Sequence, residues 1–375
     1  MKRIGLDLRL FGIEHGGIGR YCQELFPRIL ELDKENRYLL FFNKKTAAFD
    51  KLKKFQKSAN VEVIETHIRH YSLGEQLGFL RLLNKSNLDL VHFPNFNVPI
   101  FYKRPFVVTI HDLVHHKISG AKKNRWLSFL AYKKVIATAA KKAKQIITVS
   151  QASKKDVINL LQADSKKIKV IYEGAPLNSG IADEKVEEVK KSYLLNKPYF
   201  LFVGVLERKK NLVNLTRGFD YFLQKYKLNM DLVIVGKMDA HYPEIKHQAM
   251  DIKAGNNLVF TGPVDDYELD ALYKGAYAFV SASLHEGFGL PGVEALGFGL
   301  PLLVSNIEVF NEIYDNAAMY FNPLDPEDIG EKMYLLARDS QFYGQMQHKS
   351  FERSKFFNWE KAAEETLEVY KQFIS

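Results

Sequence analysis

Two glutamates flank a glycine-rich segment in the second half of the sequence, and their spacing suits a ligand that is both charged and rich in hydroxyl groups. The segment reads His285-Glu286-Gly287-Phe288-Gly289-Leu290-Pro291-Gly292-Val293-Glu294-Ala295. It follows the strand-like run 276–283 and opens an apolar, helix-like stretch. Glycines let the backbone approach a ligand closely, and proline suits the first helical turn, where free N–H groups attract anions.

The two carboxylates of this segment predict a division of roles. A carboxylate repels phosphate, so Glu286 and Glu294 are expected to hold hydroxyl groups, for instance of a sugar and a ribose. The amides from Gly287 to Leu290 and the helix dipole would then hold the charge. The simpler alternative is an ordinary helix in which Glu294 caps the first turn.

A basic run offers a second candidate for binding an anion. The residues Glu207-Arg208-Lys209-Lys210-Asn211 follow the strand-like run 199–205. A lysine side chain in such a loop can bind an anionic group of a ligand. A solvated loop charge is the alternative interpretation of Lys210.

The first half of the chain carries a glycine loop, Gly16-Gly17-Ile18-Gly19, after a strand-like amino terminus. A tight turn at Gly17 would present backbone amides to an anion. The loop lacks the third glycine of the dinucleotide fingerprint, because Cys22 stands in that place. A plain strand-to-helix turn therefore stays open as an alternative.

His111 ends the strand-like run 106–110, where the carboxyl end of a parallel strand opens onto a binding site. A metal site made by His111 and His115 is disfavoured, because neither the zincin glutamate nor a third ligand is present. Asp112 fits a loop carboxylate as well as a catalytic one. We find no Asp-x-Asp triplet and no G-x-x-x-x-G-K-[ST] loop, so we expect neither a bound metal nor an ATPase.

Short apolar runs alternate with helix-like segments along the chain, which is typical of βαβ units and parallel sheets. After residue 174 a charged, turn-rich stretch interrupts the pattern, which restarts near residue 199. We therefore expect two α/β domains, 1–175 and 196–356. A last helix, 357–375, could pack on either domain.

Composition bounds the function. The 375 residues are 46% hydrophobic and 26% charged, which is ordinary for a globular protein of about two domains. A single cysteine, Cys22, excludes an internal disulfide and fits a reducing cytoplasm. Charges at Asp7 and Arg9 interrupt any signal peptide, and no run of about 18 apolar residues occurs. We expect a cytoplasmic chain that is neither secreted nor membrane-spanning.

Charge is divided unevenly along the chain. Residues 1–174 hold 32 basic and 15 acidic residues, net +17, whereas the remainder holds 21 and 29, net −8. The basic part suggests an anionic partner: membrane lipid, a phosphorylated substrate or nucleic acid. The segment 122–134 mixes cations with Trp126, Phe129 and Leu130, so it predicts either a helix on an anionic membrane or one that packs its aromatics inward.

In their order and spacing, these motifs resemble those of the retaining glycosyltransferases of family 4, which have the GT-B fold. The resemblance covers nearly the whole chain, and Glu286 and Glu294 match its Glu-x7-Glu motif. The other matching segments are Gly16–Gly19, Thr109–Leu113, Thr148–Ser150 with Ser153 and Asp156, Gly204 to Asn211, Gly262–Val264 with Leu269, and Trp359.

The resemblance implies a fold and a set of roles. Two Rossmann-like domains would face each other across a cleft, with the acceptor on 1–175 and the nucleotide sugar on 196–356; helix 357–375 would return to the first domain. Glu286 would hold the donor sugar and Glu294 the ribose. Lys210 would bind the donor phosphates, and Gly17 and His111 would reach the reacting sugar. The amides of Gly287, Phe288, Gly289 and Leu290 would face the sugar and diphosphate.

One departure from the family pattern concerns the diphosphate. Many members carry an arginine five positions before the lysine, and this chain has Val205 there. Arg208 or Lys209 must replace that cation, and we favour Lys209.

We therefore expect a metal-independent retaining hexosyltransferase that resembles bacterial mannosyltransferases of surface polysaccharide assembly. GDP-mannose is the favoured donor and a UDP-sugar is the alternative. The acceptor would be a glycan or lipid-linked saccharide at the inner face of the plasma membrane, with the basic domain on anionic lipid. A sugar-nucleotide epimerase or phosphorylase of the same fold is the rival. Nucleic-acid binding would leave the Glu286–Glu294 segment unexplained.

Overall fold

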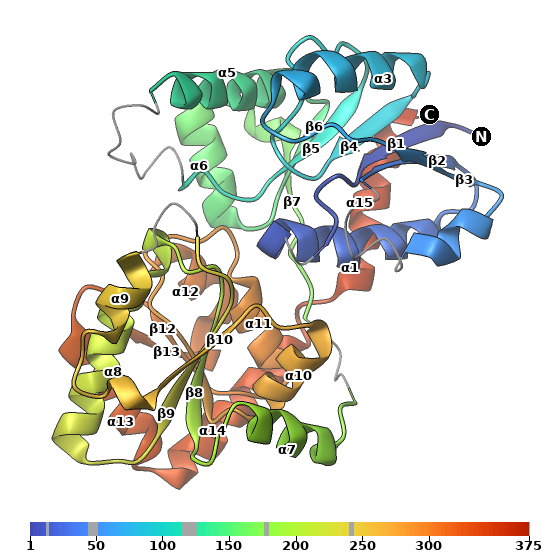
Figure 1. Ribbon diagram of the computed structural model, residues 1–375. Coiled ribbons are helices and arrows are strands. Elements are labelled where there is room, and N and C mark those ends of the chain that lie inside the picture. Colours follow the sequence, from blue (N-terminus) through green and yellow to red (C-terminus); the bar gives the residue numbers. More distant parts are fainter. Residues whose placement is uncertain (13–14, 44–51, 115–125, 176–179, 240–243, 375) are drawn as a thin grey trace. The chain divides into compact units, whose positions relative to one another are not determined.

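The computed structural model describes residues 1–12, 15–43, 52–114, 126–175, 180–239 and 244–374 (Figure 1). The chain forms two compact units. Unit 1 comprises Met1–Glu173 and Asn358–Ser375, and unit 2 comprises Gly174–Phe357. Each unit is built around a parallel sheet of its own.

In the described residues of unit 1, seven parallel strands lie in the order β3-β2-β1-β4-β5-β6-β7. Most are short apolar runs, as expected of strands that helices cover on both faces. The strands are β1 Arg3–Asp7, β2 Arg37–Phe42, β3 Val61–Glu65, β4 Leu90–Phe93, β5 Phe106–Ile110, β6 Gln145–Thr148 and β7 Ile168–Val170.

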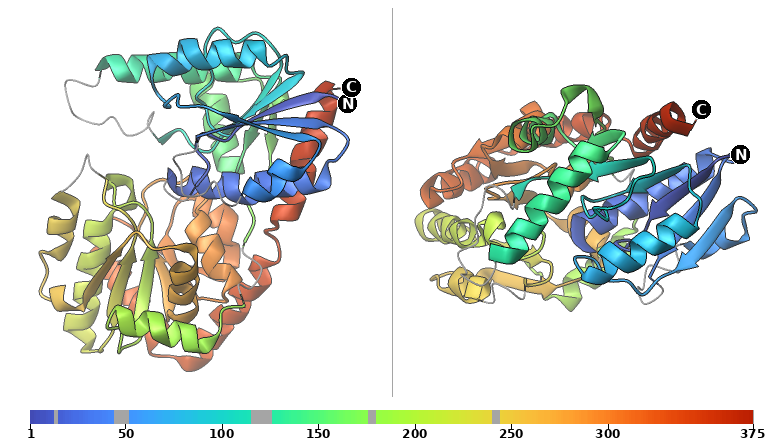
Figure 2. Two further views of the ribbon diagram at one scale, coloured as in Figure 1. Left: turned by 45° about the vertical axis from the view of Figure 1, so that its right-hand side comes forward. Right: turned by 90° about the horizontal axis from the view of Figure 1, so that it is seen from above.

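The helices of unit 1 divide between the two faces of its sheet. α3, α5 and α6 share one hydrophobic core with the strands. α1 packs against α15, the helix at the chain's carboxyl end, in all views (Figures 1 and 2). The described helices are α1 Gly16–Leu32, η2 Lys53–Lys57, η3 Glu75–Phe79, α3 Leu80–Lys85, α5 Trp126–Lys142, α6 Gln151–Leu161, η5 Ser165–Lys167 and α15 Trp359–Ile374.

The sheet of unit 2 repeats this plan. Its described strands are all parallel, in the order β10-β9-β8-β11-β12-β13. Residues of α8, α9, α13 and α14 share a core with them. The strands are β8 Tyr199–Val203, β9 Asp231–Val235, β10 Leu258–Gly262, β11 Ala278–Ser281, β12 Leu302–Ser305 and β13 Ala318–Phe321.

The helices of unit 2 include one in the segment that we expected to be a connection. α7 lies within 176–195 and packs against α10, where Asp183 Oδ1 and Lys274 Nζ are 2.7 Å apart. The described helices are α7 Asp183–Ser192, η6 Arg208–Lys210, α8 Leu212–Tyr226, α9 Glu244–Met250, η7 Gly255–Asn257, α10 Asp266–Gly275, α11 Leu290–Gly297, α12 Glu308–Tyr314, η8 Asp315–Ala317, α13 Pro326–Ala337 and α14 Ser340–Ser354.

Both sheets reverse their strand order at one place, between β1 and β4 in unit 1 and between β8 and β11 in unit 2. The predicted α/β class with two Rossmann-like domains is confirmed. In such sheets, ligands bind outside the carboxyl ends of the strands at the point of reversal. None of the described helices combines the length and apolar character needed to cross a membrane.

Candidate active site

Lys210 and Glu286 meet at the reversal point of unit 2. η6 follows β8, and Glu286 lies in the loop after β11; β8 and β11 are neighbours in the sheet. Lys210 Nζ lies 2.5 Å from Glu286 Oε1, and the Ser283 hydroxyl donates to the same oxygen at 2.7 Å. Both charged side chains are close to nine-tenths buried. The predicted cation and the predicted carboxylate thus share one site.

The electrostatics of this pair keep Glu286 ionised. Burial disfavours the carboxylate, but the charge of Lys210, then that of Lys209, and the hydrogen bonds from Lys210 and Ser283 outweigh it. They hold the pKa of Glu286 below its usual 4.5. A buried carboxylate that stays charged is a strong acceptor for hydroxyl groups.

The two basic residues before Lys210 point to different surroundings. Arg208 is more than half exposed, and its guanidinium lies 3.5 Å from Glu244 on α9. Lys209 is mostly buried, lies 3.3 Å from Glu207, and acts electrostatically on Glu286. The Lys209 carbonyl also accepts a hydrogen bond from the Leu284 N–H at 2.7 Å, which ties η6 to the loop after β11.

Asn211 fixes the turn that presents these lysines. Its backbone is left-handed, with φ of +53°, a conformation that asparagine tolerates better than most residues. Its side-chain amide donates to the Pro323 carbonyl at 2.6 Å. This bond anchors the start of α8 to the segment after β13.

Tyr314, from α12, shapes the glycine loop. Its hydroxyl donates to the Gly289 carbonyl at 2.6 Å, and the ring is fully buried. A Cβ at Gly289 would lie 2.3 Å from that hydroxyl, and one at Gly292 would lie 2.2 Å from it. Gly289 also has a φ of +96°, so both position and backbone demand glycine there.

The remaining residues of the loop are held from within unit 2. Phe288 is buried, with its ring edge-on to Phe357. Leu290 begins α11, where the first backbone N–H groups have no acceptor within the helix. Glu294 is buried, and its Oε2 accepts a hydrogen bond from Tyr273 at 3.0 Å. Gly287 completes the loop between Glu286 and Phe288.

The two predicted residues of unit 1 lie at its sheet's carboxyl edge and at the start of α1. His111 follows β5 directly; its Nε2 is 3.0 Å from the Pro94 carbonyl oxygen, and its Nδ1 is 3.3 Å from Glu173 Oε1. Gly17 lies exposed in the first turn of α1, with open space where a Cβ would be. Gly19 is the constrained glycine of this turn, because its Cβ would lie 1.7 Å from the Gly12 carbonyl oxygen.

Several partners of the predicted residues gave no sequence signal. Ser283 bonds Glu286, Tyr273 bonds Glu294, and Tyr314 holds a loop that lies 25 residues before it in the sequence. Glu173, beside His111, is separated from it in the described sequence by α5, β6, α6, η5 and β7. Ser283 lies only three residues before Glu286 in the same loop, whereas each of the other contacts joins different strands, helices or loops, so no local spacing could reveal those.

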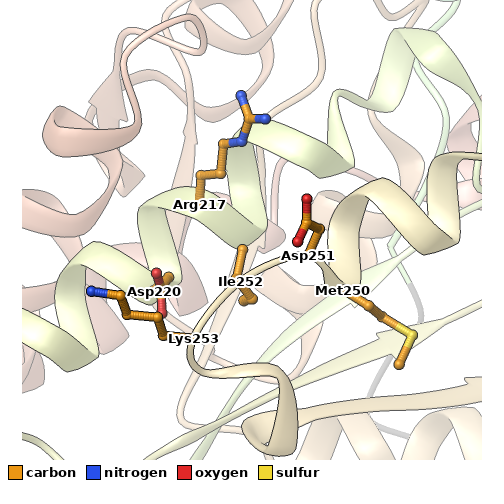
Figure 3. A pocket seen from close by; sticks show the side chains of 6 residues that line it. All are labelled: Arg217, Asp220, Met250, Asp251, Ile252 and Lys253. Carbon is orange, nitrogen blue, oxygen red and sulfur yellow. The ribbon is translucent and has the colours of Figure 1, made fainter.

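Within the residues that the structure describes, neither a metal-binding cluster nor a surface hollow of unit 2 identifies a second candidate site. In the described ranges, no group of three His, Cys, Asp or Glu side chains could hold a metal ion. His115 lies outside those ranges, as does the start of the basic segment, 122–125. A surface hollow of about 420 Å³ between α8 and residues 250–253 is lined by side chains of both charges, none of them predicted for the site (Figure 3).

Two family models match consecutive parts of the chain. Residues 15–179 match the model described as Glycosyltransferase Family 4, and residues 184–353 match that of Glycosyl transferases group 1. Together they span both units.

Curated relatives carry mannosyltransferase names. The O-antigen chain mannosyltransferase RfbU of Salmonella typhimurium is 29% identical over 247 residues, which cover 66% of this chain and 64% of that protein. The serotype-specific mannosyltransferase WbdA of Escherichia coli is 27% identical over 62% of this chain and 29% of its own length. The chain thus spans less than two thirds of these first two relatives.

Solved structures share the fold at low sequence identity. HepE of Anabaena, determined in complex with UDP and glucose, has a TM-score of 0.78 at 16% identity over 99% of this chain and all of that one. The sucrose-phosphate synthase of Thermosynechococcus elongatus has a TM-score of 0.76 at 18% identity over 99% of each chain. With matching family models along both units and this shared architecture, the chain belongs to the family 4 glycosyltransferases and has the GT-B fold.

Proposed function

We propose that this protein transfers a hexose from a nucleoside diphosphate sugar to a glycan acceptor, with retention of the anomeric configuration. The observation that carries the proposal is the buried pair of Lys210 and Glu286 at the reversal point of unit 2, beside the start of α11. A cation and a helix amino terminus suit the diphosphate of such a donor, and an ionised carboxylate suits its sugar hydroxyls.

Each residue of unit 2 then has a role. Lys210, Lys209 and the amides from Gly287 to Leu290 hold the diphosphate and the sugar. Glu286 accepts hydrogen bonds from sugar hydroxyls, and Glu294 accepts them from the ribose. Lys209 takes the place of the arginine that is absent at Val205. Its charge lowers the pKa of Glu286, whereas the Arg208 side chain lies beside Glu244.

The reaction follows from these charges. The acceptor hydroxyl attacks the anomeric carbon on the face from which the nucleoside diphosphate leaves. The bond from that carbon to the phosphate oxygen breaks, and the departing oxygen takes the acceptor's proton. Lys210, Lys209 and the α11 amides stabilise the negative charge that grows on this oxygen, so no metal is required. His111 and Gly17 act at the reacting sugar, as the family resemblance implies.

For the donor, we propose GDP-mannose. The support is the set of relatives named as mannosyltransferases, in Salmonella and in Escherichia coli. A UDP-sugar is the alternative that a binding experiment separates from it.

For the acceptor, we propose a lipid-linked saccharide on an anionic membrane that unit 1 contacts. Exposed leucines support this: Leu73 and Leu77 beside and on η3, and Leu130 on α5. Lys133 and Lys134 on α5 are exposed as well. η3, α3 and α5 contribute to one core, so these apolar and basic side chains lie on the outside of one face of the unit. The side chain of Trp126 lies outside the described part of α5.

Vesicle flotation tests this surface. We expect the protein to float with anionic vesicles but not with neutral ones. Loss of flotation in Lys133→Glu/Lys134→Glu would support this surface.

The donor experiment is a thermal-shift panel with GDP, UDP, ADP and their sugars in the presence of a chelator. We expect a selective rise with GDP and GDP-mannose, because a ligand at 100 times its Kd stabilises by about 2.7 kcal/mol. A rise in unfolding temperature with UDP alone would assign a UDP-sugar as the donor in place of GDP-mannose. No rise with any nucleotide would contradict the assigned site.

Lys210→Ala tests the chemistry itself. Loss of one preorganised group of this kind costs about 10² to 10³ in rate, and we expect at least that loss of hexosyl transfer, measured by product formation. Lys237→Ala is the control, since Lys237 is an exposed lysine in the loop after β9. Transfer by Lys210→Ala at the wild-type rate would refute the proposed function.

A further inference from the structure

His111 lies between two hydrogen-bond acceptors. Its Nε2 is 3.0 Å from the backbone carbonyl oxygen of Pro94, just after β4, and its Nδ1 is 3.3 Å from Glu173 Oε1. The imidazole is 13% exposed and the carboxyl group 5%. The histidine's own carbonyl accepts the Ser153 hydroxyl at 2.7 Å, so its backbone is also held.

The chemistry of these acceptors fixes where the protons are. A carbonyl oxygen can only accept, so Nε2 must carry a hydrogen. If the ring were neutral, the lone pair of Nδ1 would then face the lone pairs of an ionised carboxylate. A second proton, held between Nδ1 and Oε1, removes this repulsion and gives the buried carboxylate a charged partner.

Three titratable groups close to the ring, on α1 and β4, are neutral at pH 7. On α1, the ring of Tyr21 lies edge-on to the imidazole, with the ring centroids 4.8 Å apart. Cys22, the next residue in the sequence after Tyr21, is buried. Burial raises the pKa of Tyr21 beyond the physiological range and that of Cys22 well above its usual value. On β4, burial and then the charge of His111 lower the pKa of His92 to about 3, so His92 adds no charge at neutral pH.

A chain of hydrogen bonds holds Tyr21 itself. Its hydroxyl lies 3.1 Å from Thr109 Oγ1, which lies 2.8 Å from Nε2 of His92. His92 Nδ1 meets the Tyr370 hydroxyl of α15 at 2.5 Å. The carboxyl-terminal helix thereby contributes to the rigidity around His111.

We infer that Glu173 is a positioning residue that holds the His111 imidazole doubly protonated, so that a positively charged ring is fixed at the carboxyl end of β5. His111 and Glu173 share the proton that lies between Nδ1 and Oε1. The consequence for catalysis rests on the proposed function: a fixed cation near the donor favours the negative charge of the leaving diphosphate, and Glu173 acts on the reaction only through His111.

The first test observes the proton directly. The full chain is labelled with 15N-histidine, and the resonances of His111 among the 11 histidines are assigned from their absence in His111→Gln. We expect both ring nitrogens to be protonated at pH 7 in the wild type, and Nε2 alone in Glu173→Gln, whose amide can donate to Nδ1. A neutral His111 in the wild type, or the same state in both proteins, would overturn the inference.

The second test uses the pH dependence of kcat. In Glu173→Gln, the fall in rate at alkaline pH should move to lower pH by about one unit or more, because the ring has lost its carboxylate partner. A purely structural role would change stability and leave this profile unmoved. Glu62→Gln is the control, since Glu62 is an exposed carboxylate on β3 paired with Arg37.

The two tests separate the inference from the proposed function. Absence of any hexosyl transfer in the wild type would refute the function, and the nitrogen spectra would still decide the protonation of His111. A doubly protonated ring together with an unmoved pH profile would overturn the assigned role of Glu173 in the reaction.

Discussion

The carboxyl ends of the strands at the two reversal points hold charge in different ways. In unit 2, Lys209 and Lys210 follow one strand and Glu286 follows its neighbour, and some exposure remains. In unit 1, Asp7 and Arg9 at the end of β1 are buried almost completely, and the guanidinium lies 2.8 Å from Asp7 and 2.9 Å from Glu75. The guanidinium also stacks on Phe79 at 3.6 Å.

This difference indicates that the ion pair of unit 2 can bind a ligand, whereas that of unit 1 stabilises the fold. Burial opposes ionisation of Asp7, but Arg9 outweighs it and lowers the pKa of the carboxyl group. A fully buried ion pair contributes mainly to the specificity and rigidity of the fold, since little of it can reach a ligand. The partly exposed pair of unit 2 can exchange its partners for those of a substrate. Four predictions test this contrast.

The largest effect is expected for Arg9→Met. Asp7 and Glu75 would remain buried without their cation, which typically costs about 3–5 kcal/mol of folding free energy. Urea unfolding at pH 7 measures this loss. Arg37→Met, which breaks an exposed pair with Glu62, should cost less than about 1 kcal/mol. Equal losses of unfolding free energy in the two variants would show that the buried ion pair of Arg9 stabilises the fold no more than an exposed pair does.

Next in size is the effect of Lys209→Ala on transfer. We expect kcat/KM to fall by about 10²-fold, because we propose that this cation takes the place of the arginine that is absent at Val205. Arg208→Ala, which breaks an exposed pair with Glu244, should stay within about fivefold of the wild type. The reverse order would assign the second cation to Arg208. Steady-state kinetics with saturating acceptor decides between them.

A smaller effect is expected from the packing of the glycine loop. In Gly292→Ala the new Cβ would lie 2.2 Å from the Tyr314 hydroxyl, and overpacking of this kind costs about 1–3 kcal/mol. Gly344→Ala in α14 is the matched control: its Cβ meets nothing within 4 Å, so the change should stabilise by about 0.5–1 kcal/mol. Thermal unfolding reports both. Stabilisation by Gly292→Ala would contradict the tight contact of Tyr314 with this loop.

The smallest effect concerns pH. Because the pKa of Glu286 is lowered in the folded protein, its ionisation stabilises the fold above 4.5, and this contribution is lost as pH falls through the lowered value. Lys210→Met removes the main cause of the lowering. The difference in unfolding free energy between wild type and variant should therefore shrink as pH falls from 7 to below 4.5. A difference that stays constant with pH would show that Lys210 does not act on Glu286 electrostatically.

Sequence patterns predicted more of unit 2 than of unit 1. The Glu286–Glu294 loop and the lysines of η6 are short segments whose strand, loop and helix order follows from local spacing, and the structure brings Lys209, Lys210 and Glu286 together. In unit 1, the glycine turn was recognised but its constrained residue is Gly19, since Gly12 approaches it. The segment 176–195 was expected to be a connection because of its charge, yet α7 buries Val186 and Val189.

The sequence by itself determined the alternation of strands and helices and the residues of the glycine loop, because each depends on neighbours within a few positions along the chain. Parallel sheets were predicted from that alternation. Only the tertiary structure decided which groups meet: Glu173 with His111, Tyr314 with Gly289, and Lys210 with Glu286. These contacts depend on strand order, which places residues far apart in the sequence at one edge of a sheet.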